Sequence, residues 1–261
     1  MTKRAMSSEK ARKVRQQGHD DAKEFAKLIG LEDDYKNDPQ AKKDVIDLSG
    51  DAHSVKSGTK KWQIFLYSPG RFERDVIFRR LNGLGQLLLD CLNVFPDKFE
   101  DYKNNKIFYK NALQPKMLAL KEKLANPDTL EAFFDKSFFN AGEVQYLTIK
   151  QDKTFHVFHR DDVIKVLKEN IKVVNSKKRQ EGQFDNQKVV FKIENPKRPN
   201  SFITIGEIEM RNDSKIHFKE IKFWMKKDLT FGLLNEKIID KKIAKEGLII
   251  YGKAIKKFKN Y

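Results

Sequence analysis

The stretch that decides the fold is AKKDVIDLSGDAHSVKSGTKKWQIFLY, residues Ala41 to Tyr67. It contains three short apolar runs, Asp44–Leu48, Ala52–Lys56 and Trp62–Ser68. Ser-Gly pairs separate the runs, and such pairs are typical of turns between strands. The stretch therefore predicts three consecutive strands joined by short connections.

The flanking sequence predicts helices on both sides of these strands. Ala22, Phe25, Ala26 and Ile29 recur at helical spacing before them. After them, RFERDVIFRRLNGLGQLLLDCLNVF is apolar at helical spacing and predicts either one helix or two helices broken near Gly83 and Gly85. The chain continues as helices to about residue 141 and then mainly as strands, and we expect its basic end, KAIKKFKNY, to be solvated. The order predicts an α/β protein.

Charge and composition restrict the classes of partner. The chain has 261 residues, with 53 Lys and Arg against 37 Asp and Glu, a formal net charge of +16. Such an excess predicts attraction to a polyanion, either nucleic acid or an anionic membrane. No apolar run approaches the roughly 18–20 residues that a spanning helix needs. The single cysteine, Cys91, allows no internal disulfide. We expect a cytoplasmic protein with no membrane partner.

Three residues of the opening stretch suit phosphodiester chemistry. Asp44 lies in or just before the first predicted strand, and Ser54 and Lys56 are two apart on the second. Side chains two apart on a strand share a face. Metal-dependent hydrolysis of a phosphodiester needs carboxylates to hold Mg²⁺ and positive charge to stabilise the transition state. Asp21 and Glu24 on the preceding helix are further candidate metal ligands.

Residues 18–67 resemble the PD-(D/E)xK nuclease superfamily, and within it the type II restriction endonucleases. The resemblance is carried by GHDDAKEFAKLIG, KKDVID, AHSVKSG and KWQIFLY. It implies a restriction-endonuclease-like core, a mixed sheet flanked by helices, with Mg²⁺ as cofactor and double-stranded DNA as substrate. It also implies Asp44 as a metal ligand, Lys56 as the catalytic lysine, and Ser54 as a weak ligand or water contact.

The sequence departs from the pattern of that superfamily at two positions. Lys43 stands where Pro is usual, and Ser54 stands where Glu or Asp is expected. If the resemblance holds, the missing carboxylate comes from another position, and the candidates are Asp21, Glu24, Asp47 and Asp51. The implied organisation is a nuclease core over residues 1–95, a helical connector over 96–141, and a β-rich DNA-recognition region over 142–261.

A second hairpin toward the C-terminus competes for the catalytic role. Asp185 precedes one strand, and Glu207 and Glu209 lie two apart on the return strand, an ExE arrangement that some restriction endonucleases use in place of ExK. Glu220 and Lys222 have the required spacing as well.

The polar segments around this second hairpin predict a DNA-recognition surface. Arg and Lys contact phosphate or guanine, and Gln reads adenine. The candidate residues are Lys177, Lys178, Arg179, Gln180, Gln183 and Arg211.

The sequence and the resemblance together predict a type II restriction endonuclease, acting as a monomer or a homodimer. A non-catalytic DNA- or RNA-binding protein remains the alternative, because the basic surplus and the polar segments would serve it equally well.

Overall fold

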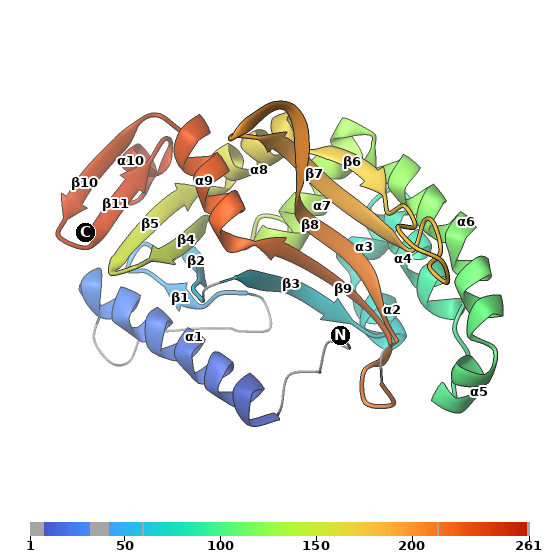
Figure 1. Ribbon diagram of the computed structural model, residues 1–261. Coiled ribbons are helices and arrows are strands. Elements are labelled where there is room, and N and C mark those ends of the chain that lie inside the picture. The colour runs from blue at the N-terminus through green and yellow to red at the C-terminus, as the bar shows by residue number, and fades with distance from the viewer. Residues whose placement is uncertain (1–7, 32–41, 59, 213, 260–261) are drawn as a thin grey trace. The chain divides into compact units, whose positions relative to one another are not determined.

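The computed structural model describes residues 8–31, 42–58, 60–212 and 214–259, which form an α/β fold (Figure 1). The helices are α1 Ser8–Leu28, α2 Pro69–Arg74, α3 Val76–Arg80, α4 Leu84–Asn93, α5 Phe99–Asn104, α6 Lys106–Leu124, α7 Pro127–Phe139, α8 Arg160–Asn170, α9 Lys227–Lys237 and α10 Ala254–Lys257. The strands are β1 Val45–Ile46, β2 Ala52–Lys56, β3 Lys61–Tyr67, β4 Tyr146–Gln151, β5 Thr154–His159, β6 Lys172–Asn175, β7 Lys188–Asn195, β8 Arg198–Asn212, β9 Phe218–Lys226, β10 Lys241–Lys245 and β11 Leu248–Tyr251. None of the helices in these ranges combines the length and the apolar character that a membrane span requires.

The chain forms two compact units, each built from segments that are far apart in the sequence. Unit 1 comprises residues 1–62, 138–166 and 231–261, and unit 2 comprises residues 63–137 and 167–230. The boundaries between units therefore differ from the expected boundaries at residues 95 and 141. The chain passes from unit 1 to unit 2 and back twice, so neither unit is a continuous stretch of sequence.

Unit 1 is built on a mixed sheet of six strands in the order β1-β2-β4-β5-β11-β10. β2 pairs with β4 and β5 pairs with β11 in parallel, whereas the β1–β2, β4–β5 and β10–β11 pairs are antiparallel. Helices lie on both faces. Phe25 of α1 contacts Phe155 on one face, and Phe231 of α9 contacts His156 and Phe158 on the other. The expected mixed sheet flanked by helices is present in this unit.

The apolar stripe of α1 forms the core of unit 1 as its spacing predicts. Ala22, Phe25, Ala26 and Ile29 are buried against residues of the sheet. Burying side chains of this size stabilises the folded state by about 1.5–3 kcal/mol each for the larger ones. The helix is thereby fixed on one face of the strands that carry Asp44 and Lys56.

The end of the chain also belongs to this core, which corrects the expectation of a solvated tail. α10 covers part of KAIKKFKNY, with Ala254 and Phe258 buried. The ring of Phe258 lies 5.0 Å from that of His53 and 5.5 Å from that of Tyr146. The lysines of this segment are exposed, while Ala254 and Phe258 are buried; its last two residues, 260 and 261, lie outside the described residues.

Unit 2 contains a five-stranded sheet in the order β3-β9-β8-β7-β6. Its core is rich in phenylalanine, and the rings of Phe65, Phe133, Phe191 and Phe223 pack between the sheet and the helices. In the second helical stretch, the expected break near the glycines is present. Gly83 has φ +78° and precedes α4, and a Cβ on Gly85 would lie 2.4 Å from the carbonyl oxygen of Phe78. Glycine is therefore required where α3 and α4 meet.

Candidate functional site

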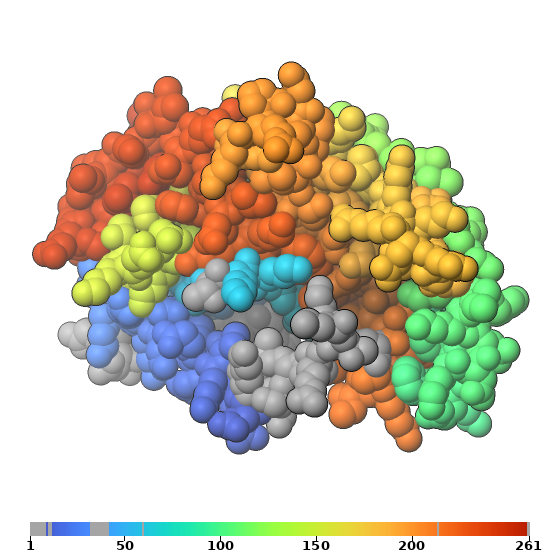
Figure 2. Space-filling model, viewed as in Figure 1, coloured from blue at the N-terminus to red at the C-terminus, as the bar shows by residue number. Residues whose placement is uncertain are grey.

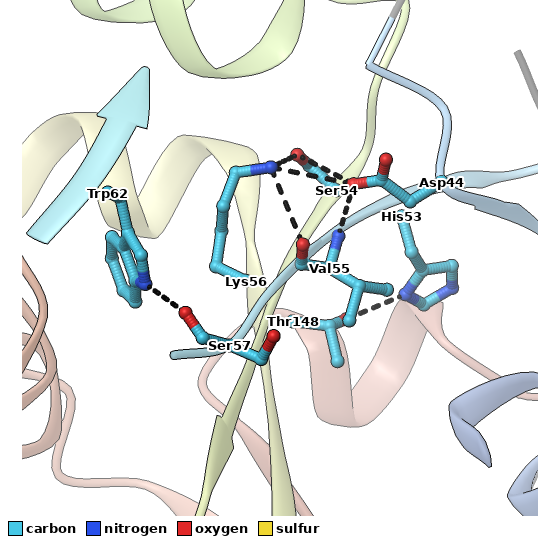
Figure 3. Close-up of polar contacts among 8 residues, drawn as sticks. All are labelled: Asp44, His53, Ser54, Val55, Lys56, Ser57, Trp62 and Thr148. Carbon is cyan, nitrogen blue, oxygen red and sulfur yellow. Dashed lines mark hydrogen bonds and ion pairs between the residues drawn. The ribbon is translucent and has the colours of Figure 1, made fainter. Parts of the chain in front are cut away.

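Asp44, Ser54 and Lys56 come together on unit 1 (Figure 3). The Lys56 amine lies 2.7 Å from the Ser54 hydroxyl oxygen and 3.5 Å from Asp44 Oδ2. The Ser54 hydroxyl is 3.4 Å from the same carboxylate oxygen. The side chains of Lys56 and Asp44 are 21% and 27% exposed, so both are accessible to a substrate. We call Asp44, Ser54 and Lys56 the Asp44 cluster.

The main chain of β2 fixes the carboxylate in this position. The amide of Asp44 donates to the carbonyl of His53, and the amide of Val55 donates to Asp44 Oδ2 at 2.8 Å. The carboxylate thus accepts a hydrogen bond that would otherwise extend the sheet beyond β1. The Lys56 amine is also 3.5 Å from the Val55 carbonyl oxygen. Three oxygen atoms, one each from Asp44, Ser54 and Val55, therefore surround the ammonium group.

The alternation of β2 separates this cluster from the side chains that face α1. His53 and Val55 point away from the Asp44 cluster in Figure 3. The ring of His53 packs 4.9 Å from that of Phe25, and its Nδ1 lies 3.0 Å from the Thr148 hydroxyl. Burial lowers the pKa of His53, although the carboxylate of Asp47 opposes this shift. His53 is thus a core residue of the α1 face.

Asp21 and Glu24 gather around a different lysine, Lys150 at the end of β4. The Lys150 amine lies 2.7 Å from Asp21 Oδ1 and 2.6 Å from Glu24 Oε2. Burial alone would raise the pKa of Asp21, but hydrogen bonds from Lys150, Ser57 and Gln17 outweigh it and lower that pKa. Burial would likewise lower the pKa of Lys150, but its bonds to the two carboxylates raise it above its ordinary value.

These carboxylates lie on the opposite face of the sheet from Asp44. Lys56 pairs with Ile149 in the parallel β2–β4 register, so the next residue, Lys150, projects from the other face. Asp21 and Glu24 reach Lys150 from α1 and therefore stay on that side. The expectation that Asp21 or Glu24 shares an ion with Asp44 is not met by this arrangement.

Asp47 and Asp51 do not supply the missing carboxylate to the Asp44 cluster either. Asp47 Oδ1 accepts the amides of Ser49 and Asp51, and its Oδ2 lies 3.5 Å from His53 Nε2. Asp51 accepts the hydroxyl of Tyr146 at 3.2 Å. Both carboxylates thus order the β1–β2 turn on the α1 face. Across residues 8–31, 42–58, 60–212 and 214–259, no three His, Cys, Asp or Glu side chains form a group that could hold a metal ion.

The oxygen atoms around the Lys56 amine are of the types that bind Mg²⁺ in proteins. They belong to one carboxylate, one hydroxyl and one main-chain carbonyl. Mg²⁺ in proteins is usually held by one or two carboxylates, with waters and substrate phosphates completing its coordination. Asp44 supplies one such carboxylate, but the Lys56 amine already lies among these oxygens, and they form no closed all-protein cage.

The rival site in unit 2 brings two of its three residues together. Lys188 lies 2.9 Å from Glu207 Oε2 and 2.6 Å from Glu209 Oε2, and the Trp224 indole donates to Glu209 at 3.1 Å. Burial would raise the pKa of Glu209, but Lys188 outweighs it and lowers that pKa. Asp185 instead accepts the amide of Lys178 in the preceding loop. This carboxylate pair is already neutralised by lysine.

The expected recognition residues fall into two places on unit 2. Arg211 lies on β8 opposite Glu220 of β9. The others are exposed in the loop between β6 and β7, where the Arg179 amide donates to the side-chain oxygen of Gln183 and orders the turn. These loop residues are Lys177, Lys178, Arg179, Gln180 and Gln183.

Two groups that position the candidate site residues were not identifiable from the sequence. The main-chain amide of Val55 orients Asp44, and Lys150 holds the acids of α1. Lys150 lies 94 residues beyond Lys56, and only the pairing of β2 with β4 reveals their neighbourhood. Comparisons of the chain with protein-family models, with curated proteins and with solved structures returned no match.

Proposed function

We propose that this chain is a Mg²⁺-dependent endonuclease that hydrolyses phosphodiester bonds of double-stranded DNA at specific sites, in the manner of a type II restriction enzyme, and that unit 1 contains its restriction-endonuclease-like core. The observation that carries the proposal is the convergence of Asp44, Ser54 and Lys56 on one face of the β1–β2 hairpin, where Asp44 and Lys56 are partly exposed and Ser54 is buried. Their spacing matches the motif through which residues 18–67 resemble PD-(D/E)xK nucleases.

Each residue of the Asp44 cluster has a distinct role in the proposed reaction. The Lys56 ammonium stabilises the negative charge that develops on the phosphate, and it orients the attacking water. The Ser54 hydroxyl is buried 2.7 Å from the Lys56 amine, and it positions that amine. The Val55 amide keeps the Asp44 carboxylate aimed toward them.

The Asp44 carboxylate would hold Mg²⁺. A bound Mg²⁺ supplies Lewis-acid stabilisation of the phosphate and lowers the pKa of a bound water. The Ser54 hydroxyl and the Val55 carbonyl lie against the Lys56 amine, so Asp44 is the one carboxylate of the Asp44 cluster that is available to the ion. The cluster therefore depends on substrate phosphate to complete the coordination of the ion.

The charge of the chain and the exposed loop of unit 2 support DNA as the substrate. The net charge of +16 favours a polyanion. The loop between β6 and β7 exposes cationic and amide side chains of the kind that contact phosphates and base edges.

Incubation of the purified protein with unmethylated phage and plasmid DNA tests the proposal. We expect discrete fragments with Mg²⁺ and intact DNA with EDTA. If the protein binds these DNAs but leaves all of them intact with Mg²⁺, the proposal fails in favour of a non-catalytic DNA-binding protein. Preferential binding to single-stranded RNA would instead favour the RNA-binding alternative.

A further inference from the structure

The distal half of the β7–β8 hairpin in unit 2, with the adjacent end of β6, carries a group of four cations. Lys172 of β6 pairs with Lys192 of β7, and Glu194 of β7 pairs with Phe202 of β8. The Lys172 amine lies 5.1 Å from the centre of the Phe202 ring, so these side chains share a face. Lys197 and Arg198 in the hairpin turn are exposed. We call Lys172, Lys192, Lys197, Arg198 and Phe202 the hairpin face.

The turn that carries Lys197 and Arg198 is ordered by its own hydrogen bonds. The Lys197 amide donates to the Asn195 side chain at 3.0 Å, and the Ser201 hydroxyl donates to the Arg198 carbonyl at 2.7 Å. The Asn200 amide donates to Glu194 at 3.2 Å. A preordered turn loses little conformational entropy when a ligand binds. In Figure 2 the orange segment that includes this turn stands out at the top of the view.

Charge is distributed unevenly along this side of the sheet. Nearer the other end of β7 and β8, Lys188 and Lys222 neutralise Glu207 and Glu209. Within the part of the chain that the structure describes, none of the four cations of the hairpin face is paired with a carboxylate. Glu194, the acid nearest to them in the register, uses a carboxylate oxygen to accept the Asn200 amide. The hairpin face therefore has four cations against the single carboxylate of Glu194, and its net charge is positive.

We propose that the hairpin face binds the phosphate backbone of duplex DNA. A two-stranded antiparallel ribbon is narrow enough to enter the major groove, and cations along and at the end of such a ribbon reach the flanking phosphates. Phe202 is 48% exposed, and it supports the stem of Lys172 within the cationic group. The choice of duplex DNA rests on the proposed function, while the anionic character of the partner rests on the charges alone.

The double variant Lys197→Ala/Arg198→Ala tests this assignment. Affinity for a labelled duplex is measured by fluorescence anisotropy in EDTA, so that no cleavage occurs, over a range of salt concentrations. Each lost phosphate contact reduces the slope of log affinity against log salt by about 0.9, so two lost contacts reduce it by about 1.8 and weaken binding about 60-fold at 0.1 M salt. The matched control is Lys241→Ala/Lys245→Ala, which removes two exposed cations from β10 of unit 1.

The inference is overturned if the double variant keeps the parent slope, or if the control loses as much slope as the double variant. It is also overturned if the loss appears with anionic lipid vesicles or single-stranded RNA and not with duplex DNA. The proposed nuclease function fails separately, when the parent protein binds DNA normally but does not cut it with Mg²⁺. If the parent protein cuts DNA and the double variant keeps the parent salt slope, only the DNA-binding role of the hairpin face is rejected, and the proposed nuclease function stands.

Discussion

Asp44→Asn removes one negative charge from the proposed catalytic centre while keeping its shape. Asparagine retains a side-chain oxygen that can accept the Val55 amide, the hydrogen bond that anchors Asp44 at 2.8 Å. What is lost is the charge beside the Lys56 amine, 3.5 Å away, and the ability to hold a divalent cation. The substitution therefore separates the stability of the hairpin from its proposed chemistry.

The two effects differ greatly in expected size. The Asp44–Lys56 ion pair is partly exposed, and such pairs contribute about 0.2–1 kcal/mol to the free energy of unfolding. A loss of that size lowers the melting temperature by no more than about 2–4 °C in a chain of this length. Removal of one electrostatic group from a catalytic centre lowers the rate of the chemical step by about 100- to 1000-fold.

The assay is single-turnover cleavage of plasmid DNA at fixed Mg²⁺, with the melting temperature measured on the same samples. Asp20→Asn is the matched control, because Asp20 is an exposed aspartate of α1 whose side chain accepts a hydrogen bond from Gln16. We expect the control to cut at the parent rate. A rate for Asp44→Asn within about tenfold of the parent, at unchanged stability, would refute the role given to Asp44.

Three further predictions concern stability. Asp21→Asn should lower the free energy of unfolding in urea by about 1–3 kcal/mol at pH 7, because it weakens the hydrogen bonds to Lys150. The pKa of Asp21 is lowered on folding, so the difference between variant and parent should shrink as the pH falls below about 4; a constant difference would contradict the assignment. Gly85→Ala should destabilise unit 2 by about 1–3 kcal/mol, because the new Cβ meets the backbone of Phe78; an unchanged urea midpoint would count against this close approach. Burial lowers the pKa values of His53 and His159, so as the pH is lowered these residues take up protons in the unfolded state before the folded state. The melting temperature should therefore fall as the pH is lowered from 7 to 5, and a constant or rising melting temperature would contradict this.

Two of the three strands predicted in the opening stretch keep their bounds to within one residue, whereas the predicted strand Asp44–Leu48 is reduced to β1, Val45–Ile46. The predicted strand Ala52–Lys56 is β2 with the same bounds, and the predicted strand Trp62–Ser68 is shifted by one residue from β3. Two-residue spacing placed Ser54 and Lys56 on one face, and the structure adds Asp44 to them. Strand alternation and turn residues act over a few positions, so a single sequence is sufficient to predict them.

These local patterns do not predict which strands pair when the strands are far apart in the sequence. The parallel pairing of β2 with β4 joins residues more than 90 positions apart. Because of this pairing, Asp21 and Glu24 form ion pairs with Lys150 and do not join the Asp44 cluster. The C-terminal segment was expected to be solvated because of its lysines, yet Phe258 packs in the core of unit 1. The high charge density of this segment indicates correctly that its lysines are solvated. A single buried aromatic side chain, that of Phe258, is nevertheless enough to pack the short helix against the core.

The most direct test of the proposed catalytic centre is Lys56→Met, which keeps an unbranched side chain, one atom shorter, and removes its charge. Cleavage rate and DNA affinity are measured in parallel, the first with Mg²⁺ and the second in EDTA. We expect cleavage at saturating protein to fall by about 100-fold or more while affinity at 0.1 M salt falls by no more than about eightfold, because Lys56 acts on the reacting phosphate and makes a single phosphate contact. Cleavage at the parent rate by Lys56→Met would show that the Asp44 cluster is not the catalytic centre.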